Sequence, residues 1–169
     1  MPKVRPKTYP LIPINLTQVV TSDGATLAGV VAEPKGRKKA ALIWLHGLTS
    51  SFDSGQALMR QLSQACNQRG IGYFKFNTRG HHVVTKDGFG SAYEKFEDCL
   101  KDIEAMIALA KQRGYRQIIL AGHSTGASKA LYYAAKKKNP LIKGLLLTGP
   151  ASDIAGELKK LASLDSSSD

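Results

Sequence analysis

Cysteine is scarce in this sequence, whose 169 residues include two, Cys66 and Cys99. Two cysteines are too few for a disulfide framework, and no paired Cys/His spacing indicates a zinc site. Each cysteine falls at an apolar position of a helical pattern, where a free thiol is usually buried. We therefore expect two buried thiols, a reducing cytoplasmic setting, and no metal or other cofactor.

Long apolar runs are also absent. No stretch approaches the roughly 20 apolar residues that a membrane-spanning helix requires. Lys3, Arg5 and Lys7 near the N-terminus are not followed by the apolar segment of a secretory signal. The sequence thus predicts neither a membrane span nor export. Its length and its 43% of hydrophobic residues predict one globular domain over residues 1–169.

Acidic residues are outnumbered by basic ones, and the formal net charge is +11. A large positive charge is one property of surfaces that bind nucleic acids. Here the charge is divided between residues 35–39 and Lys136–Lys138, and neither segment is interleaved with aromatic residues. We interpret the first as a solvated loop and the second as a helix end, where the helix dipole favours lysine. We therefore expect no nucleic-acid partner.

Strand-like and helix-like segments alternate along the chain. The apolar runs at 14–20 and 26–32 flank the turn signal Ser22-Asp23-Gly24, which predicts a hairpin. Such alternation predicts a mostly parallel sheet with helices on both faces. Further strands are predicted over 40–45, 71–76, 117–121 and 141–148, and helices over 54–69, 94–113 and 127–137, with another helix starting at 154–162.

Two of the predicted helices have a distinct apolar face, which we expect to be buried. Residue 114, a glycine, is a plausible C-cap for the second of them. The apolar residues are Leu58, Leu62, Ala65 and Cys66 in the first helix, and Phe96, Cys99, Leu100, Ile103, Met106, Ile107 and Ala110 in the second.

The segment Gly122–Gly126 has the pattern G-x-S-x-G and lies between a predicted strand and a predicted helix. In that context the pattern is typical of a nucleophilic serine on a sharp turn. The turn leaves little room for side chains, so glycines flank Ser124 two residues away on either side. Ser124 is therefore the candidate nucleophile. The alternative is an ordinary glycine-rich connection between a strand and a helix.

An acyl-transfer site also needs two N–H groups aimed at the developing oxyanion. One is expected from Thr125, directly after the nucleophile, at the start of a helix whose dipole favours negative charge. The other is expected from Leu48, which follows His46-Gly47 at the end of the 40–45 strand. We expect His46 to hold this loop in place rather than to act as a catalytic base.

Together these motifs resemble those of the α/β-hydrolase superfamily of serine hydrolases, in particular small members of unassigned substrate. The matching residues, in the order that the superfamily shows, are Asp23-Gly24, His46-Gly47, the 77–81 segment, the helix with Asp98 and Asp102, and Gly122–Gly126. The resemblance implies an α/β-hydrolase fold and a catalytic triad in the order nucleophile, acid, histidine.

No histidine follows Ser124 in the sequence. The resemblance therefore implies that the triad acid and histidine lie beyond residue 169, so that this domain is incomplete and lacks its C-terminal part. Within the chain, His81 and His82 are alternative bases, whereas His123 should point away from the site. Asp153 stands where a minority of relatives carry the acid, although a helix N-cap is the stronger interpretation.

The leading hypothesis is a serine hydrolase that acts on carboxylic esters or related small acyl substrates through an acyl-enzyme on Ser124. Without its base the serine is a weak nucleophile, so we expect the chain by itself to be poorly active. A first alternative is a non-catalytic binding protein or inactive fragment with a hydrolase fold. A second is a basic surface that binds nucleic acid. The sequence indicates neither the particular substrate nor the oligomeric state.

Overall fold

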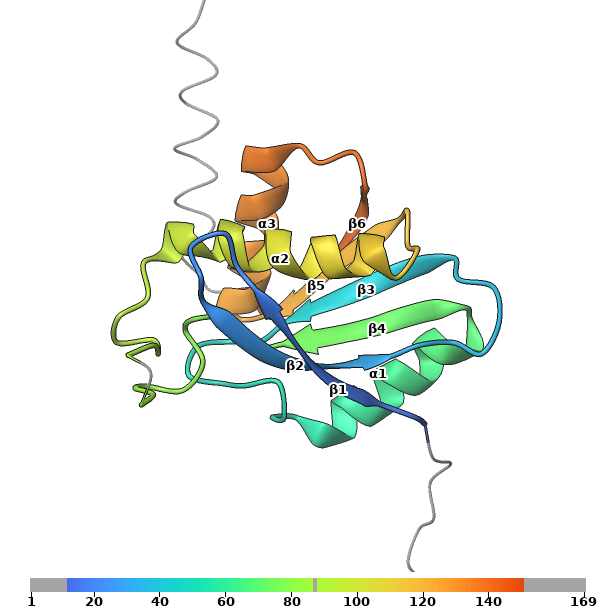
Figure 1. Ribbon diagram of the computed structural model, residues 1–169, viewed down its shortest axis with the longest axis horizontal. Helices are drawn as coiled ribbons and strands as arrows, with labels where there is room; N and C mark the ends of the chain where they lie inside the picture. Colours follow the sequence, from blue (N-terminus) through green and yellow to red (C-terminus); the bar gives the residue numbers. More distant parts are fainter. Residues whose placement is uncertain (1–11, 87, 151–169) are drawn as a thin grey trace, which may run out of the picture.

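A twisted six-stranded sheet is the centre of the computed structural model, which describes residues 12–86 and 88–150 (Figure 1). The strand order is β1-β2-β4-β3-β5-β6. The hairpin β1–β2 is antiparallel and joins β4 in antiparallel fashion, whereas β4, β3, β5 and β6 are parallel. The strands are β1 (Asn15–Val20), β2 (Thr26–Ala32), β3 (Ala40–Leu45), β4 (Ile71–Phe76), β5 (Ile118–His123) and β6 (Ile142–Thr148).

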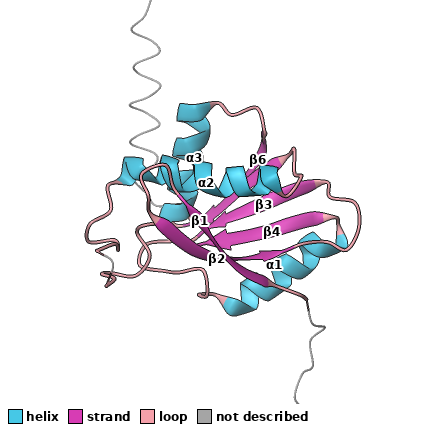
Figure 2. Ribbon diagram, viewed as in Figure 1, coloured by secondary structure: helices cyan, strands magenta, loops and turns pink. Residues whose placement is uncertain are grey.

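Helices cover both faces of the sheet (Figure 2). Helix α1 (Gln56–Gln68) packs on one face, while α2 (Cys99–Gln112) and α3 (Thr125–Lys137) pack on the other. The predicted α/β class, the N-terminal hairpin and the mostly parallel sheet are all confirmed. The helix predicted over 154–162 lies outside the described residues.

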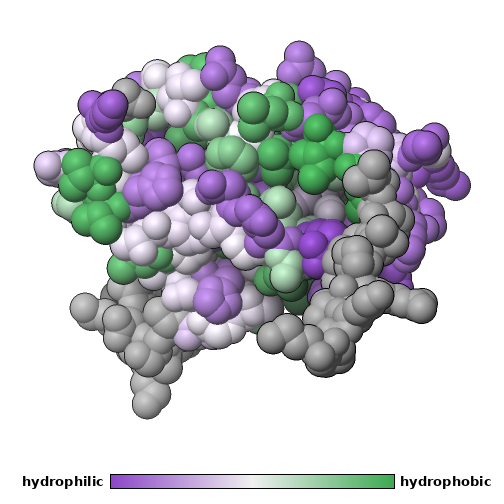
Figure 3. Space-filling view, turned by 90° about the horizontal axis from the view of Figure 1, so that it is seen from below, coloured by the Kyte–Doolittle hydropathy of each residue, from purple (hydrophilic) through white to green (hydrophobic). Residues whose placement is uncertain are grey.

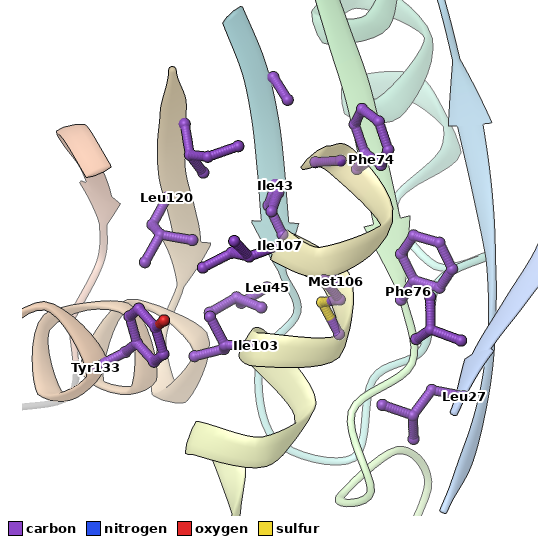
Figure 4. Packing of buried hydrophobic residues seen from close by; sticks show 14 of the residues in the cluster. Leu27, Ile43, Leu45, Phe74, Phe76, Ile103, Met106, Ile107, Leu120 and Tyr133 are labelled. Carbon is purple, nitrogen blue, oxygen red and sulfur yellow. The ribbon is translucent and has the colours of Figure 1, made fainter. Parts of the chain in front are cut away.

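The larger apolar core lies between the sheet and α2 (Figure 4). Ile103, Met106 and Ile107 of α2 point toward the sheet, where β3 and β4 present their own apolar side chains. This arrangement follows from periodicity, because residues three and four apart share one helix face and alternate residues share one strand face. The facing strand residues include Ile43, Leu45, Phe74 and Phe76.

Two details of the predicted helices are wrong. The segment predicted as a helix from 94 begins with a 3₁₀ turn, η1 (Phe96–Asp98), because Lys95 has extended backbone angles and the α-helix starts only at Cys99. In α1, Leu58 is 50% exposed, although its spacing predicted burial. The helix instead turns Met59, Leu62 and Cys66 toward the smaller core on its face of the sheet.

The connection between β5 and α3 is shorter than predicted. Strand β5 extends to His123 and α3 begins at Thr125, so a single residue separates them. The backbones crowd here: a Cβ atom on Gly122 would lie 2.3 Å from the Gly126 carbonyl oxygen. A Cβ atom on Gly126 would lie 2.3 Å from the carbonyl oxygen of Leu45. Glycine at both positions therefore allows α3 to start directly against the end of β3.

Replacing Gly126 by alanine should destabilise the protein by about 1–3 kcal/mol, because the added methyl group meets backbone that cannot move aside. The matched control is Gly144→Ala in β6, where a Cβ atom would meet nothing within 4 Å. Urea unfolding of both variants measures the difference. Equal stability of Gly126→Ala and the unmodified chain would contradict this packing.

Strand β6 lies at one edge of the sheet, and no described residue pairs with its outer side. Leu145 and Leu146 are 39% and 41% exposed, on opposite faces of the strand. An apolar run of this kind is typical of a strand that is covered on both faces. The described part of the chain therefore leaves an apolar sheet edge at β6 unpaired.

We expect the chain to self-associate through this edge, because unpaired strand edges act as templates for further pairing. Replacing Leu146 by lysine should shift the protein toward monomer, which light scattering at several concentrations would measure. Val83→Lys, at a 58% exposed loop position, is the matched control. A monomer at every concentration before any substitution would refute the prediction.

Candidate catalytic site

Ser124 occupies the turn between β5 and α3 with strained backbone angles, φ 54° and ψ −126°. A non-glycine residue in such a conformation costs on the order of 1–3 kcal/mol and persists only when its surroundings hold it. Here the Ser124 N–H donates to the Thr148 carbonyl at 3.0 Å, and the Ala127 N–H donates to the Ser124 carbonyl at 2.9 Å. The turn is thus held from β6 on one side and from α3 on the other.

The loop after β3 lies directly against this turn. A Cβ atom on Gly47 would lie 3.2 Å from the Cβ atom of Ser124. The Ser50 N–H donates to the Gly47 carbonyl at 3.2 Å, which closes the loop into a turn around Leu48. Among the described residues the Leu48 N–H donates to no backbone or side-chain acceptor. That N–H therefore has no protein acceptor among the described residues.

Thr125 is the first residue of α3. The first N–H groups of a helix have no acceptor within the helix, so the Thr125 amide is also available. The three residues predicted for the site therefore lie in adjacent segments. Ser124 is in the turn after β5, Leu48 is in the loop after β3, and Thr125 is at the start of α3.

His46 holds the loop after β3 in place. The Thr78 N–H donates to His46 Nε2 at 3.0 Å, so the ring proton resides on Nδ1, which lies 2.8 Å from the Gly47 carbonyl oxygen. Burial lowers the pKa of His46 to about 4. With both ring nitrogens occupied and a 2% exposed side chain, this histidine ties the loop to the end of β4, as the sequence led us to expect.

Among the described residues, none of the other histidines forms a hydrogen bond with the Ser124 hydroxyl. His81 Nδ1 lies 2.9 Å from the Thr78 carbonyl oxygen, and its ring is 5.2 Å from that of His82. His123 lines a pocket on the α1 face of the sheet. Among the described residues, Ser124 Oγ has no hydrogen bond to a histidine or a carboxylate. Asp153, the other acid considered, lies outside the described residues.

A buried ion cluster around Arg79 connects three distant segments. The Arg79 backbone N–H and Nε donate to the Asp102 carboxylate of α2 at 2.9 and 3.0 Å. The guanidinium also donates to Asp23 in the β1–β2 turn at 2.9 Å. Burial raises the pKa of Asp102, whereas Arg79 holds the pKa of Asp23 well below its usual range. The motif residues Asp23, Arg79 and Asp102 therefore act together in fixing the loop after β4.

A second buried ion pair joins that loop to α3. Lys129, five residues after Ser124, is 3% exposed, and its Nζ donates to Glu94 and to Thr78 Oγ1. Removing one partner of such a buried pair typically costs about 3–5 kcal/mol, because the other charge is left uncompensated. Sequence reasoning missed this pair, since Lys129 and Glu94 are separated by 35 residues and neither has a diagnostic spacing.

Both cysteines are free and buried, as predicted. Burial raises the pKa of both thiols, that of Cys99 to about 12. Residues 12–86 and 88–150 contain no group of three or more His, Cys, Asp or Glu side chains arranged to hold a metal ion. Within the same ranges, no helix has the length and hydropathy needed to cross a membrane.

The surface carries no single apolar face in the view of Figure 3, where apolar residues gather in separate patches between polar ones. The exposed apolar residues near the site belong to its loops: Leu48, Val83 and Val84 are each more than half exposed. The His82 N–H donates to the Ser50 carbonyl at 3.2 Å, so the loop after β4 adjoins the loop after β3.

Known proteins share the fold of this chain. An esterase of Pyrococcus furiosus superposes with a TM-score of 0.67 at 22% identity over 90% of this chain and 56% of the esterase. The α/β-hydrolase GrgF of Penicillium sp. superposes with a TM-score of 0.67 at 20% identity over 93% of this chain and 55% of that enzyme. The chain thus spans about half the length of these structures, which share its fold.

Sequence comparison leads to the same superfamily. An uncharacterized abhydrolase domain-containing protein of Dictyostelium discoideum is 29% identical over 136 residues, which are 80% of this chain and 14% of that protein. The family model described as serine aminopeptidase, S33, matches residues 36–166. The chain therefore belongs to this serine aminopeptidase family of the α/β-hydrolases.

Proposed function

We propose that the protein is a serine hydrolase of carboxylic esters or related small acyl substrates, with Ser124 as its nucleophile. One observation carries the proposal: Ser124 holds a strained turn at the carboxyl end of a central parallel strand, against the Gly47 loop. Ligands of open α/β sheets bind outside the carboxyl ends of the strands. The esterase fold shared with the Pyrococcus furiosus protein is consistent with this chemistry.

The proposed reaction proceeds through an acyl-enzyme. Ser124 Oγ attacks the carbonyl carbon and passes its proton to a base, while the Leu48 and Thr125 N–H groups stabilise the oxyanion. The alcohol leaves with a proton from the same base, and water then hydrolyses the acyl-serine by the reverse sequence. Since no described histidine forms a hydrogen bond with Ser124 Oγ, this scheme requires a histidine and a carboxylate from elsewhere in the whole protein.

A non-catalytic binding protein is the second candidate. The observation that favours it is the same lack of a hydrogen-bonded base beside Ser124 among the described residues. A fold that kept its oxyanion loop but lost its base would still bind acyl compounds at this edge of the sheet. Reactivity of the serine, rather than binding at the site, separates the two candidates.

A fluorophosphonate probe should label Ser124 in the whole protein, because it forms a covalent bond to an activated serine in the way that an acyl substrate does. Ser124→Ala should abolish labelling. The matched control is Ser128→Ala, one turn further along α3, which should keep it. Mass spectrometry of the labelled peptide locates the adduct. Labelling that survives Ser124→Ala would refute the assignment, and a folded protein that takes up no label would favour the binding protein.

A further inference from the structure

A pocket lies on the face of the sheet opposite α2 and extends to the loop after β3, where Gly47 adjoins Ser124. Its volume is about 120 Å³. Its apolar walls come from β3, β4 and α1, with Trp44 and Tyr73 on the sheet and Leu58 and Met59 on the helix. The other end, toward the loop after β3, is lined by His46, Gly47, Ser50 and His123. An apolar cavity of roughly 150 Å³ is enough to hold benzene. The pocket therefore suits a small ligand with an apolar group.

One positive charge, Lys75 of β4, lines this pocket and is 4% exposed. Its ammonium group donates to the Ser54 carbonyl. An ammonium group has three donors, so two remain for other acceptors. Burial lowers the pKa of Lys75, and the nearby Asp53 carboxylate opposes that shift. Asp53 itself accepts a hydrogen bond from the Ser51 hydroxyl.

Lys75 differs from the other buried cations of the described domain. Arg79 forms ion pairs with Asp23 and Asp102, and Lys129 forms one with Glu94. No described carboxylate lies within ion-pair distance of Lys75. Since a buried charge is costly unless it is paired, this lysine is the place where an anionic ligand would be most stabilising.

The start of α1 adds to the positive potential of this pocket. Ser54 and Gly55 line it, and α1 begins at the next residue with no side-chain cap and no acidic residue in its first turn. The N-terminal end of a helix carries a partial positive charge that favours anions. This contribution acts on the same side of the pocket as the Lys75 ammonium, because that group contacts the Ser54 carbonyl.

We propose that this pocket binds a small monocarboxylate with a short apolar or aromatic group. The carboxylate pairs with Lys75, and the apolar group lies among Trp44, Tyr73 and the α1 side chains. Lys75 is the only lysine or arginine among the lining residues, and one such group favours a single carboxylate over phosphate, whose larger charge calls for several charged donors. Because Gly47 lines this pocket and also lies against Ser124, the pocket adjoins the proposed catalytic site. Carboxylate binding is measured without any acyl transfer, so failure of this proposal can be distinguished from failure of the proposed hydrolase chemistry.

Trp44 makes the proposal directly measurable, because it is the only tryptophan in the sequence. Its indole N–H gives one resonance in a ¹H–¹⁵N spectrum of the full chain. Titration with benzoate should move this resonance saturably, whereas the neutral analogue benzamide should move it at least about 10-fold less effectively, since a charge-assisted hydrogen bond is lost. Inorganic phosphate should not compete with benzoate.

Two substitutions test the role of the charge. Lys75→Met should weaken benzoate binding at least about 10-fold. Leu58→Glu, at a half-exposed position that tolerates change, should abolish binding by supplying a competing carboxylate to the pocket. Leu16→Glu on β1, at a 75% exposed position, is the matched control and should bind normally.

The proposal is overturned if benzoate produces no saturable shift, if benzamide binds as tightly as benzoate, or if phosphate displaces benzoate. It is also overturned if Leu58→Glu binds benzoate as the Leu16→Glu control does. That last comparison keeps the test decisive even where Lys75→Met fails to fold, because Leu58 is not part of the buried core.

Discussion

The arrangement of the candidate site depends on one steric constraint, the contact of the first turn of α3 with the end of β3. No side chain fits between them, because a Cβ atom on Gly126 would lie 2.3 Å from the Leu45 carbonyl oxygen. This contact lets α3 follow β5 after a single residue, Ser124, which has a positive φ. It also brings the Gly47 loop against the serine. The proposed nucleophile and the proposed oxyanion donors are therefore positioned by backbone packing.

Buried charges hold the remaining side of the site. The ion cluster of Arg79 and the pair of Lys129 with Glu94 attach the long loop after β4 to the hairpin, to α2 and to α3. A loop rich in glycine and polar residues has little apolar surface to bury. The ion pairs, rather than an apolar core, therefore fix the conformation of this loop. Lys75, on the other face of the sheet, has no such ion pair with a described carboxylate. The proposed carboxylate-binding pocket depends on this lysine.

Sequence patterns located most of the elements because the signals are local. The apolar run of β3 and the 3.6-residue period of α2 report burial directly, so the bounds of β3 and the buried face of α2 were predicted correctly. Boundaries were less accurate where geometry between elements decides them. The β5–α3 connection shortens to one residue only because Gly122 and Gly126 permit close packing, and η1 precedes α2 because Lys95 is extended.

The sequence by itself determined the α/β class, the hairpin, the buried cysteines and Ser124 as the candidate nucleophile, since each rests on residues adjacent in the chain or repeated at a regular period. Only the tertiary structure decided which residues meet across the fold. Arg79 meets Asp23 across 56 residues, Lys129 meets Glu94 across 35, and Lys75 remains without a described carboxylate. Ion pairs between residues far apart in the chain produce no periodic pattern in the sequence. They depend on the strand order and on which helix covers which face of the sheet.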